Sequence, residues 1–281
     1  MEQTSLLNTN KYEHKFILSS SGLKKRDYSQ LKTDKKNSGL RRIPVFFIAV
    51  FASCLMTGAF GQATKTLLFD ISHGQAYSNA ADAYKSLLPK DITATIEVSS
   101  GEITPATLKD KKALILLMPT VPFKEAEKEA IVEYLHIGGS LLLVFDEERR
   151  MSLKGVAVND IIAPFNIRLT EDAPVRHNCG AIAEENEICA GKRELPYSGG
   201  RSIEGGTIIA RVYNEGNYIH SAYMKLSAGG KIIVMSDGMA AILLGRPDGE
   251  RFSGTGPADS KFWGKDSRIY MEEILTFLLK E

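Results

Sequence analysis

An uninterrupted apolar run, Ala113-Leu114-Ile115-Leu116-Leu117-Met118, is followed directly by Pro119. A strand can be apolar at every position only when both of its faces are covered, so this run predicts a central strand of a parallel sheet. Three similar runs, 65–70, 140–146 and 231–238, carry an aspartate at or beside their ends. They predict three further buried strands, each ending in an acid.

Amphipathic segments alternate with these strands along the chain. Apolar residues recur every three or four positions in 75–88 and in 267–280, which predicts a helix in each segment. A third helix is expected over 124–137, because Glu125 and Glu127 suit the positive end of a helix dipole.

The remaining segments predict smaller elements. Residues 92–98 alternate apolar and polar side chains, as in a half-exposed strand near a sheet edge. Segments 207–213 and 218–226 are typical of two strands joined as a hairpin. We expect a short helix over 158–165 and a turn-rich, irregular segment over 170–206.

This alternation of strands and helices predicts the α/β class. Strand–helix–strand units cross over in the right-handed sense, so the expected architecture is a flavodoxin-like three-layer sandwich. Its sheet is mostly parallel and has helices on both faces. Ligands of such sheets bind beyond the carboxyl ends of the strands.

Charge is distributed unevenly along the 281 residues. Residues 1–42 carry ten Lys and Arg against four acids, residues 43–61 carry no charge, and the rest of the chain has a net charge of −5. We therefore expect a basic segment without a fold at 1–42, an apolar segment at 43–61 and one α/β domain at 64–281. A domain of negative charge is a poor binder of nucleic acid, because phosphate contacts need clustered basic residues.

The apolar segment resembles an export signal. Arg41 and Arg42 precede it and small residues follow it, which is the pattern of a secretory signal peptide. The sequence leaves three outcomes open: cleavage before Gln62, retention of 43–60 as a transmembrane anchor, or lipidation of Cys54. Each outcome places the domain outside the inner membrane, in the periplasm or the cell envelope.

Export changes the expected state of the cysteines. Cys179 and Cys189 lie in the domain, ten positions apart, and an oxidising compartment allows them to pair as a disulfide. The alternative is two reduced thiols. A metal site is not expected, since the nearest histidine, His177, does not complete a four-ligand spacing. No spacing typical of a phosphate loop or a dinucleotide fold occurs, so no cofactor is expected either.

Aspartates end three of the predicted core strands, and the fold should bring them toward one edge of the sheet. The candidate ligand-binding residues are Asp70, Ser72, His73, Gly74, Asp146, Glu147 and Asp237. Among them, His73, Asp70 and Asp146 are also candidates for catalysis, with an imidazole base held by a carboxylate. The alternative is structural, because acids also close strands by accepting backbone N–H groups.

Four segments, in this order, resemble one group of proteins. They are Phe69-Asp70-Ile71-Ser72-His73-Gly74-Gln75, Leu116-Leu117-Met118-Pro119-Thr120-Val121-Pro122-Phe123, Gly138-Gly139-Ser140-Leu141-Leu142 and Gly230-Lys231-Ile232-Ile233-Val234-Met235-Ser236-Asp237. With the closing amphipathic helix, they resemble the class I glutamine-amidotransferase-like domains. Within that group they are most similar to the non-catalytic GIFT-type domains, named for a subunit of intraflagellar transport, and to domains of gliding-motility and ABC-transporter auxiliary proteins.

The resemblance includes a departure that bears on function. Amidotransferases place a nucleophilic cysteine directly after the strand that is 141–145 here, whereas this sequence has Asp146-Glu147-Glu148. A carboxylate does not replace a thiolate in that chemistry. The resemblance therefore implies an exported, non-catalytic module that binds a glycan or a protein partner at the cell envelope. The alternative is an exported hydrolase or deacylase that uses His73 with a strand-end carboxylate.

Overall fold

The computed structural model describes residues 63–75, 77–173, 179–213, 218–244, 262 and 264–281. The chain divides into two units, Met1–Gly58 and Ala59–Glu281, and the described residues belong to the second. The segments 1–42 and 43–61 lie outside the described residues, so the export signal stays a prediction. No helix in the described part of the chain is long and apolar enough to cross a membrane.

The described residues form strands, α-helices and two 3-10 turns. The strands are β1 (Lys65–Asp70), β2 (Ala94–Ser99), β3 (Lys111–Leu117), β4 (Ser140–Val144), β5 (Ile167–Asp172), β6 (Cys179–Ala183), β7 (Arg193–Tyr197), β8 (Arg201–Gly205), β9 (Thr207–Val212), β10 (Ile219–Lys225) and β11 (Lys231–Met235). The helices are α1 (Ala81–Lys85), α2 (Pro105–Leu108), α3 (Glu125–His136), α4 (Leu153–Val156), α5 (Asn159–Ile162), α6 (Met239–Ile242) and α7 (Ser267–Leu279), with 3-10 turns η1 (Ser78–Ala80) and η2 (Ala163–Phe165).

Nine of the described strands form one sheet in the order β2-β1-β3-β4-β11-β10-β9-β6-β7. The first five strands in this order are parallel to one another. The other four are joined by antiparallel pairing. β5 and β8 form a separate antiparallel pair. The five parallel strands have the flavodoxin-like order 2-1-3-4-5, which confirms the predicted fold class.

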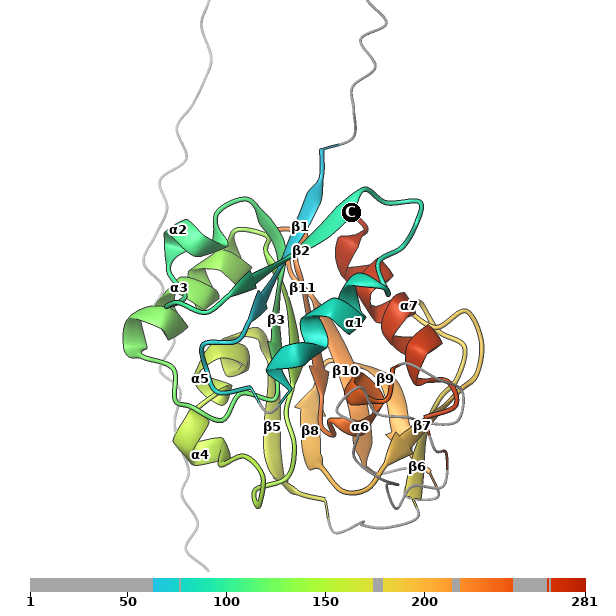
Figure 1. The fold of residues 1–281 in the computed structure, drawn as a ribbon. Helices are drawn as coiled ribbons and strands as arrows, with labels where there is room; N and C mark the ends of the chain where they lie inside the picture. Colours follow the sequence, from blue (N-terminus) through green and yellow to red (C-terminus); the bar gives the residue numbers. More distant parts are fainter. Residues whose placement is uncertain (1–62, 76, 174–178, 214–217, 245–261, 263) are drawn as a thin grey trace, which may run out of the picture. The chain divides into compact units, whose positions relative to one another are not determined.

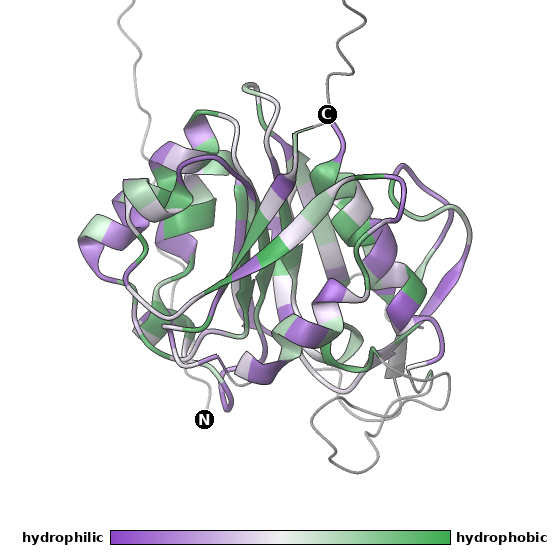
Figure 2. Cartoon of the chain, turned by 45° about the horizontal axis from the view of Figure 1, so that its top comes forward, coloured by the Kyte–Doolittle hydropathy of each residue, from purple (hydrophilic) through white to green (hydrophobic). Residues whose placement is uncertain are grey.

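Helices cover both faces of the parallel part of the sheet. Figure 1 shows α2, α3 and α5 on one side and α1 and α7 on the other. Every residue of β4 and β11 is buried, as are the last five of β3. The central strands are accordingly green in Figure 2, whereas the helices carry both hydrophobic and hydrophilic residues. Each fully buried Leu or Ile side chain in these strands contributes about 1.5–3 kcal/mol to folding.

The helices α3 and α7 match the predicted segments. On α7 the side chains of Tyr270, Ile274, Phe277 and Leu278 are buried, as their spacing predicts. α3 ends at His136, and two residues later Gly138 adopts a φ of +105°, which lets the chain leave the helix without strain because glycine has no Cβ.

The helix predicted over 75–88 is much shorter than expected. Residues 78–80 form the 3-10 turn η1, and α1 extends from Ala81 to Lys85. Neither element has a side-chain cap at its start. Ser78 and Asn79 also favour turns over helix interiors, since their side chains compete for backbone hydrogen bonds. The apolar face of this segment still packs on the core through Tyr84 and Leu87.

The described residues of the segment 170–206 are mostly strands, which corrects the predicted irregular segment. It contains β6, β7, β8 and the end of β5. β6 and β7 continue the main sheet, and Pro196 lies in the outermost strand, β7, where a missing N–H group costs least. Each of these strands has five residues, and their glycines and Pro196 interrupt the local pattern. Pairing with distant strands, rather than local propensity, therefore determines their conformation.

The predicted Cys179–Cys189 disulfide is absent from this structure, where Cys189 is a free, buried thiol. The backbone of Cys179, the first residue of β6, pairs with Tyr197 at the end of β7. Cys189 lies in the loop at the opposite end of this hairpin, beyond Ala183. Four steps of about 3.4 Å along β6 put that end roughly 14 Å away. A disulfide allows a Cα separation of only about 7 Å.

Candidate binding site at the carboxyl edge of the sheet

Asp70 ends β1 and organises the turn that follows it. Its Oδ1 accepts hydrogen bonds from the backbone N–H of Ser72 at 3.0 Å and from the Ser72 hydroxyl at 2.6 Å. This turn brings the ring of His73 back toward the strand, so that its Nδ1 lies 2.8 Å from Oδ2 of Asp70. The Gln75 side-chain amide also donates to Oδ2. Asp70 is fully buried, which makes this strand end an internal polar centre.

The second ring nitrogen of His73 faces another carboxylate. Its Nε2 lies 3.3 Å from Oε2 of Glu127, in the first turn of α3. The ring stacks on Phe123, with 4.0 Å between ring centroids and an interplanar angle of 25°. Only 4% of His73 is exposed. The imidazole is therefore held at both nitrogens and along one face.

Glu127 was not among the predicted site residues. Its Oε2 accepts the backbone N–H of Lys124 at 2.9 Å, and its Oε1 accepts that of Ile103 at 2.9 Å. One carboxylate thus caps the start of α3, anchors the chain before α2 and meets His73. A sequence signal for this role exists, because Glu127 lies at helical spacing from the buried Ala130 and Ile131. An acid on the core face of a helix needs a buried partner.

The electrostatics of the Asp70–His73–Glu127 network favour the charged forms. Burial alone lowers the pKa of His73, but the hydrogen bonds and charges of Asp70 and Glu127 outweigh it and raise that pKa. Burial alone raises the pKa of Asp70 and of Glu127, but hydrogen bonds from His73 and from backbone N–H groups lower both. An imidazolium between two carboxylates satisfies all three groups.

Gly74 joins the network to an exposed loop. It has a φ of +62°, and a Cβ there would lie 2.7 Å from Oγ1 of Thr120 and 2.8 Å from Cγ2 of Val121. The neighbouring carbonyl of His73 accepts the backbone N–H groups of Thr120 at 2.9 Å and Val121 at 3.0 Å. The predicted role of Gly74 in ligand binding is untested. In the structure it permits this close approach of two loops.

The loop after β3 lies at the topological switch point of the sheet. In the order 2-1-3-4-5 the direction of winding reverses between β1 and β3, and ligands of such folds bind there. The exposed residues around this point are Glu102, Thr120, Val121, Pro122 and Lys124, which we call the switch-point surface. Val121 is 46% exposed, and Lys124 pairs with Glu102.

Asp146 and Asp237 form a second cluster, at the ends of the neighbouring strands β4 and β11. Asp146 Oδ1 accepts the N–H of Glu147 at 2.7 Å, and Asp237 Oδ1 accepts the N–H of Met239 at 2.6 Å. Both carboxyl groups are buried. Burial and the nearby charge of Asp146 raise the pKa of Asp237 well above its usual range. Both aspartates accept backbone N–H groups just beyond the strand ends, which is the structural role that the sequence analysis gave as the alternative to ligand binding.

Arg201 stabilises this second cluster, and the sequence did not single it out. Its guanidinium donates to the backbone carbonyls of Asp146 at 2.9 Å and Met151 at 2.8 Å and pairs with Glu148. Glu147 is also buried, and it pairs with Arg149 and Arg150. The predicted site residues therefore divide between two clusters, one under the switch-point surface and one beneath the ends of β4 and β11. Among the described residues, no group of three His, Cys, Asp or Glu could hold a metal ion.

The family model of the IFT52 GIFT domain matches residues 66–181, less than half of the chain. The matched residues include Asp70, His73, Glu127 and Asp146. The match supports a GIFT-type domain. Its start coincides with β1, and its end lies within β6. No curated protein matches the chain.

Solved structures support the same fold. The chain is similar to the structure titled mmIFT52 N-terminal domain, with a TM-score of 0.57 and 17% identity over 77% of this chain and 98% of that one. It is also similar to a ThuA-like protein from Parabacteroides merdae, with a TM-score of 0.50 and 10% identity over 77% and 90% of the two chains. At these identities the likeness shows the fold alone.

Proposed function

We propose that the GIFT-type domain is an exported, non-catalytic amidotransferase-like module that binds a protein partner at the cell envelope through the switch-point surface. The observation that carries this proposal is the state of His73. Both of its ring nitrogens face buried carboxylates, at 2.8 and 3.3 Å. An imidazole held in this way has no free nitrogen to accept a proton from a substrate.

Asp146, two residues after the end of β4, supports the same interpretation. Amidotransferases carry their nucleophile at this position, and here it is Asp146, which is 1% exposed and accepts backbone N–H groups. A buried carboxylate in this position holds the ends of β4 and β11 together. We therefore propose that this domain shares the fold of the amidotransferase-like domains and does not share their chemistry.

The chemistry of the switch-point surface favours a protein over a glycan. Val121 and Pro122 present apolar atoms beside the Lys124–Glu102 pair, an arrangement typical of an apolar interface centre with a charged rim. The loop is also ordered before binding, because its N–H groups at 120 and 121 are bonded to the His73 carbonyl. A preorganised loop lowers the entropy cost of association. A glycan is the alternative ligand of this surface.

The alternative activity, an exported hydrolase or deacylase, requires His73 as a base oriented by an acid. The 2.8 Å contact with Asp70 supplies that orientation, but Glu127 faces the nitrogen that would take the proton. We therefore expect His73→Gln to leave partner binding intact. An esterase activity of the full chain that His73→Gln abolishes would support the alternative instead.

Site-specific photocrosslinking in cells that express the full chain tests the proposal. A benzophenone side chain replaces Val121 in one variant and, as a matched control, Ile269, which is 47% exposed on α7. We expect a light-dependent adduct with one envelope protein at position 121 and none at 269, and we expect Pro122→Glu to weaken it. Equal adducts at both positions would contradict the proposed surface. Calorimetry against envelope glycans covers the other ligand class, and heat with a glycan but no adduct would replace the protein partner by that glycan.

A further inference from the structure

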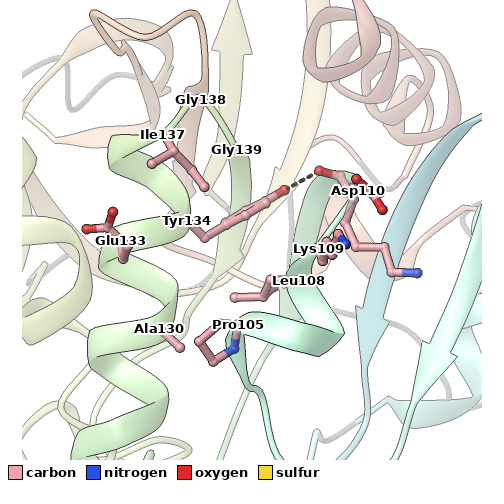
Figure 3. A pocket seen from close by; sticks show the side chains of 11 residues that line it. Pro105, Leu108, Lys109, Asp110, Ala130, Glu133, Tyr134, Ile137, Gly138 and Gly139 are labelled. Atoms are coloured by element: carbon pink, nitrogen blue, oxygen red, sulfur yellow. Dashed lines mark hydrogen bonds between the residues drawn. The ribbon is translucent and has the colours of Figure 1, made fainter.

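A pocket of about 390 Å³ lies between α2 and α3, toward the C-terminal end of α3, whereas the switch-point surface borders the start of that helix. Figure 3 shows side chains of both helices lining the pocket, with the ring of Tyr134 extending from α3. Ligand sites in proteins are concave and mostly apolar, with a volume of about 300–1,000 Å³. This pocket therefore has the size of a site for a small ligand. Its apolar side chains are Pro105, Leu108, Ala130, Tyr134 and Ile137.

The Tyr134 ring is a fixed wall of the pocket. Its hydroxyl donates to the backbone carbonyl of Lys111 at 3.2 Å and accepts the backbone N–H of Ser140 at 3.3 Å. The ring lies directly over Gly139, where a Cβ would come within 2.2 Å of Tyr134 Cζ. The glycine lets the ring pack against the backbone, and the two hydrogen bonds hold it in that position.

The opposite wall, α2, is also held in place. The Thr104 hydroxyl accepts the backbone N–H of Thr107 at 3.2 Å, and the Thr107 hydroxyl accepts that of Thr104 at 2.8 Å. Glu127 of α3 accepts the backbone N–H of Ile103, directly before this cap, at 2.9 Å. These bonds tie α2 to α3. The pocket is therefore formed before a ligand binds, which lowers the entropy cost of binding.

The charged side chains that line the pocket favour a cation. Asp110 and Glu133 are exposed, and within the described residues neither forms an ion pair. The Lys111 ammonium pairs with Glu97, so it does not neutralise these acids. Lys109 is exposed and is the one lysine of the lining that has no ion pair within the described residues. The unpaired side chains together leave one net negative charge at the pocket.

The end of α3 favours the same sign of charge. The last turn of α3, from Glu133 to His136, borders the pocket, and the C-terminal end of a helix dipole carries partial negative charge. His136, the basic residue of this turn, contacts Phe165 instead, with 4.8 Å between ring centroids. The aromatic ring of Tyr134 also attracts a cation placed near its face. An anionic ligand would face both acids and the negative end of the helix.

We propose that the pocket between α2 and α3 binds a small organic cation that carries one apolar ring and an ammonium group. The ring lies among Leu108, Tyr134 and Ile137, and the ammonium group lies at the exposed rim beside Asp110 and Glu133. This site is separate from the switch-point surface. The proposal therefore does not depend on the proposed function.

Titrations of the purified full chain, followed by saturation-transfer NMR of the ligand, test the sign of the charge. The probes are phenethylammonium, phenethyl alcohol and phenylacetate, which share a phenyl ring and carry a positive, a neutral or a negative head group. We expect phenethylammonium to bind at least about threefold more tightly than the alcohol, and phenylacetate to bind most weakly. Equal binding of the three probes, or no binding of any at millimolar concentration, would overturn the proposal.

Charge reversal at the rim supplies a variant with a matched control. In Glu133→Lys the order should reverse, so that phenylacetate binds more tightly than phenethylammonium. Glu129→Lys, one turn earlier on α3 and outside the pocket lining, should keep the wild-type order. Both glutamates are exposed, so neither change disturbs the core. A gain of phenylacetate binding cannot come from unfolding, whereas equal effects of the two variants would show attraction by overall charge and overturn the proposal.

A change at the apolar rim tests the position of the ring. Ile137 is 71% exposed, and Ile137→Ser should weaken phenethylammonium binding by about threefold or more, because it removes apolar surface from the pocket. The matched control is Ile269→Ser on α7, where the side chain is 47% exposed and lies outside the pocket lining. Wild-type affinity in Ile137→Ser, or an equal loss in Ile269→Ser, would place the ring elsewhere and overturn the proposal.

Discussion

His73 Nδ1 lies 2.8 Å from Oδ2 of Asp70, and the residues are only three positions apart in the chain. The contact is local, yet it depends on a distant group. Glu127, 54 positions away, holds the other nitrogen of the same ring. The network therefore ties the end of β1 to the start of α3 beneath the switch-point surface, and its removal should be visible as lost stability.

The Asp70–His73–Glu127 network should make stability depend on pH. The raised pKa of His73 stabilises the fold fully below about 6.5, its unfolded value, and this contribution disappears as the pH rises through the folded value. The lowered pKa values of Asp70 and Glu127 stabilise the fold above their unfolded values, 3.8 and 4.5, and this contribution disappears as the pH falls through the folded values.

Urea unfolding of wild type and His73→Gln across this range measures the effect. The difference in unfolding free energy between the two proteins should be largest between pH 4.5 and 6.5, the unfolded values that bound the window. It should shrink toward alkaline pH. A difference that stays constant up to alkaline pH would show that His73 is neutral in the folded protein.

Glu127→Gln should cost about 1–3 kcal/mol of unfolding free energy near pH 6, because it removes one of the two carboxylates that face the buried imidazolium while Asp70 remains. The matched control is Glu129→Gln on the exposed face of the same helix, which should change stability by less than about 0.5 kcal/mol. Chemical denaturation of the two variants compares them directly. Similar losses would mean that helix charge, and not the buried contact, is responsible.

Gly200→Ala should destabilise the ends of β8 and β11 by about 1–3 kcal/mol. A Cβ at Gly200 would lie 2.2 Å from the backbone carbonyl oxygen of Ser236, which no side-chain rotation can relieve. Gly101→Ala is the control, since a Cβ there meets nothing within 4 Å. Thermal unfolding should show a lower Tm for the first variant only.

Cys189 should resist alkylation in the folded protein. Burial, followed by the charge of Glu273, raises the pKa of its thiol to about 12, so almost no thiolate is present at pH 8. Iodoacetamide should modify Cys189 only after denaturation, and a non-reducing peptide map should contain no Cys179–Cys189 disulfide. Recovery of that linked peptide from the native protein would contradict the hairpin geometry.

Local pattern was sufficient for the strongest elements. β1, β3, β4 and β11 were predicted because strands buried on both faces are continuously apolar. α7 was predicted from its apolar face, and α3 from the acids Glu125 and Glu127 in its first turn. The short helices α2, α4 and α6 were missed, since four residues are too few to display a helical period. β6, β7 and β8 were missed because their conformation depends on strands far away in sequence.

By itself, the sequence determined the α/β class, the parallel core, the strand-end acids and the local Asp70–His73 turn. These features depend on the pattern of apolar residues and on contacts between residues close together in the chain, and both can be recognised in the order of residues. Tertiary structure alone decided that Glu127 meets His73, that Asp146 and Asp237 are buried together, and that Cys189 stands apart from Cys179. These relationships join residues through packing, and packing between distant segments has no period that a single sequence can display.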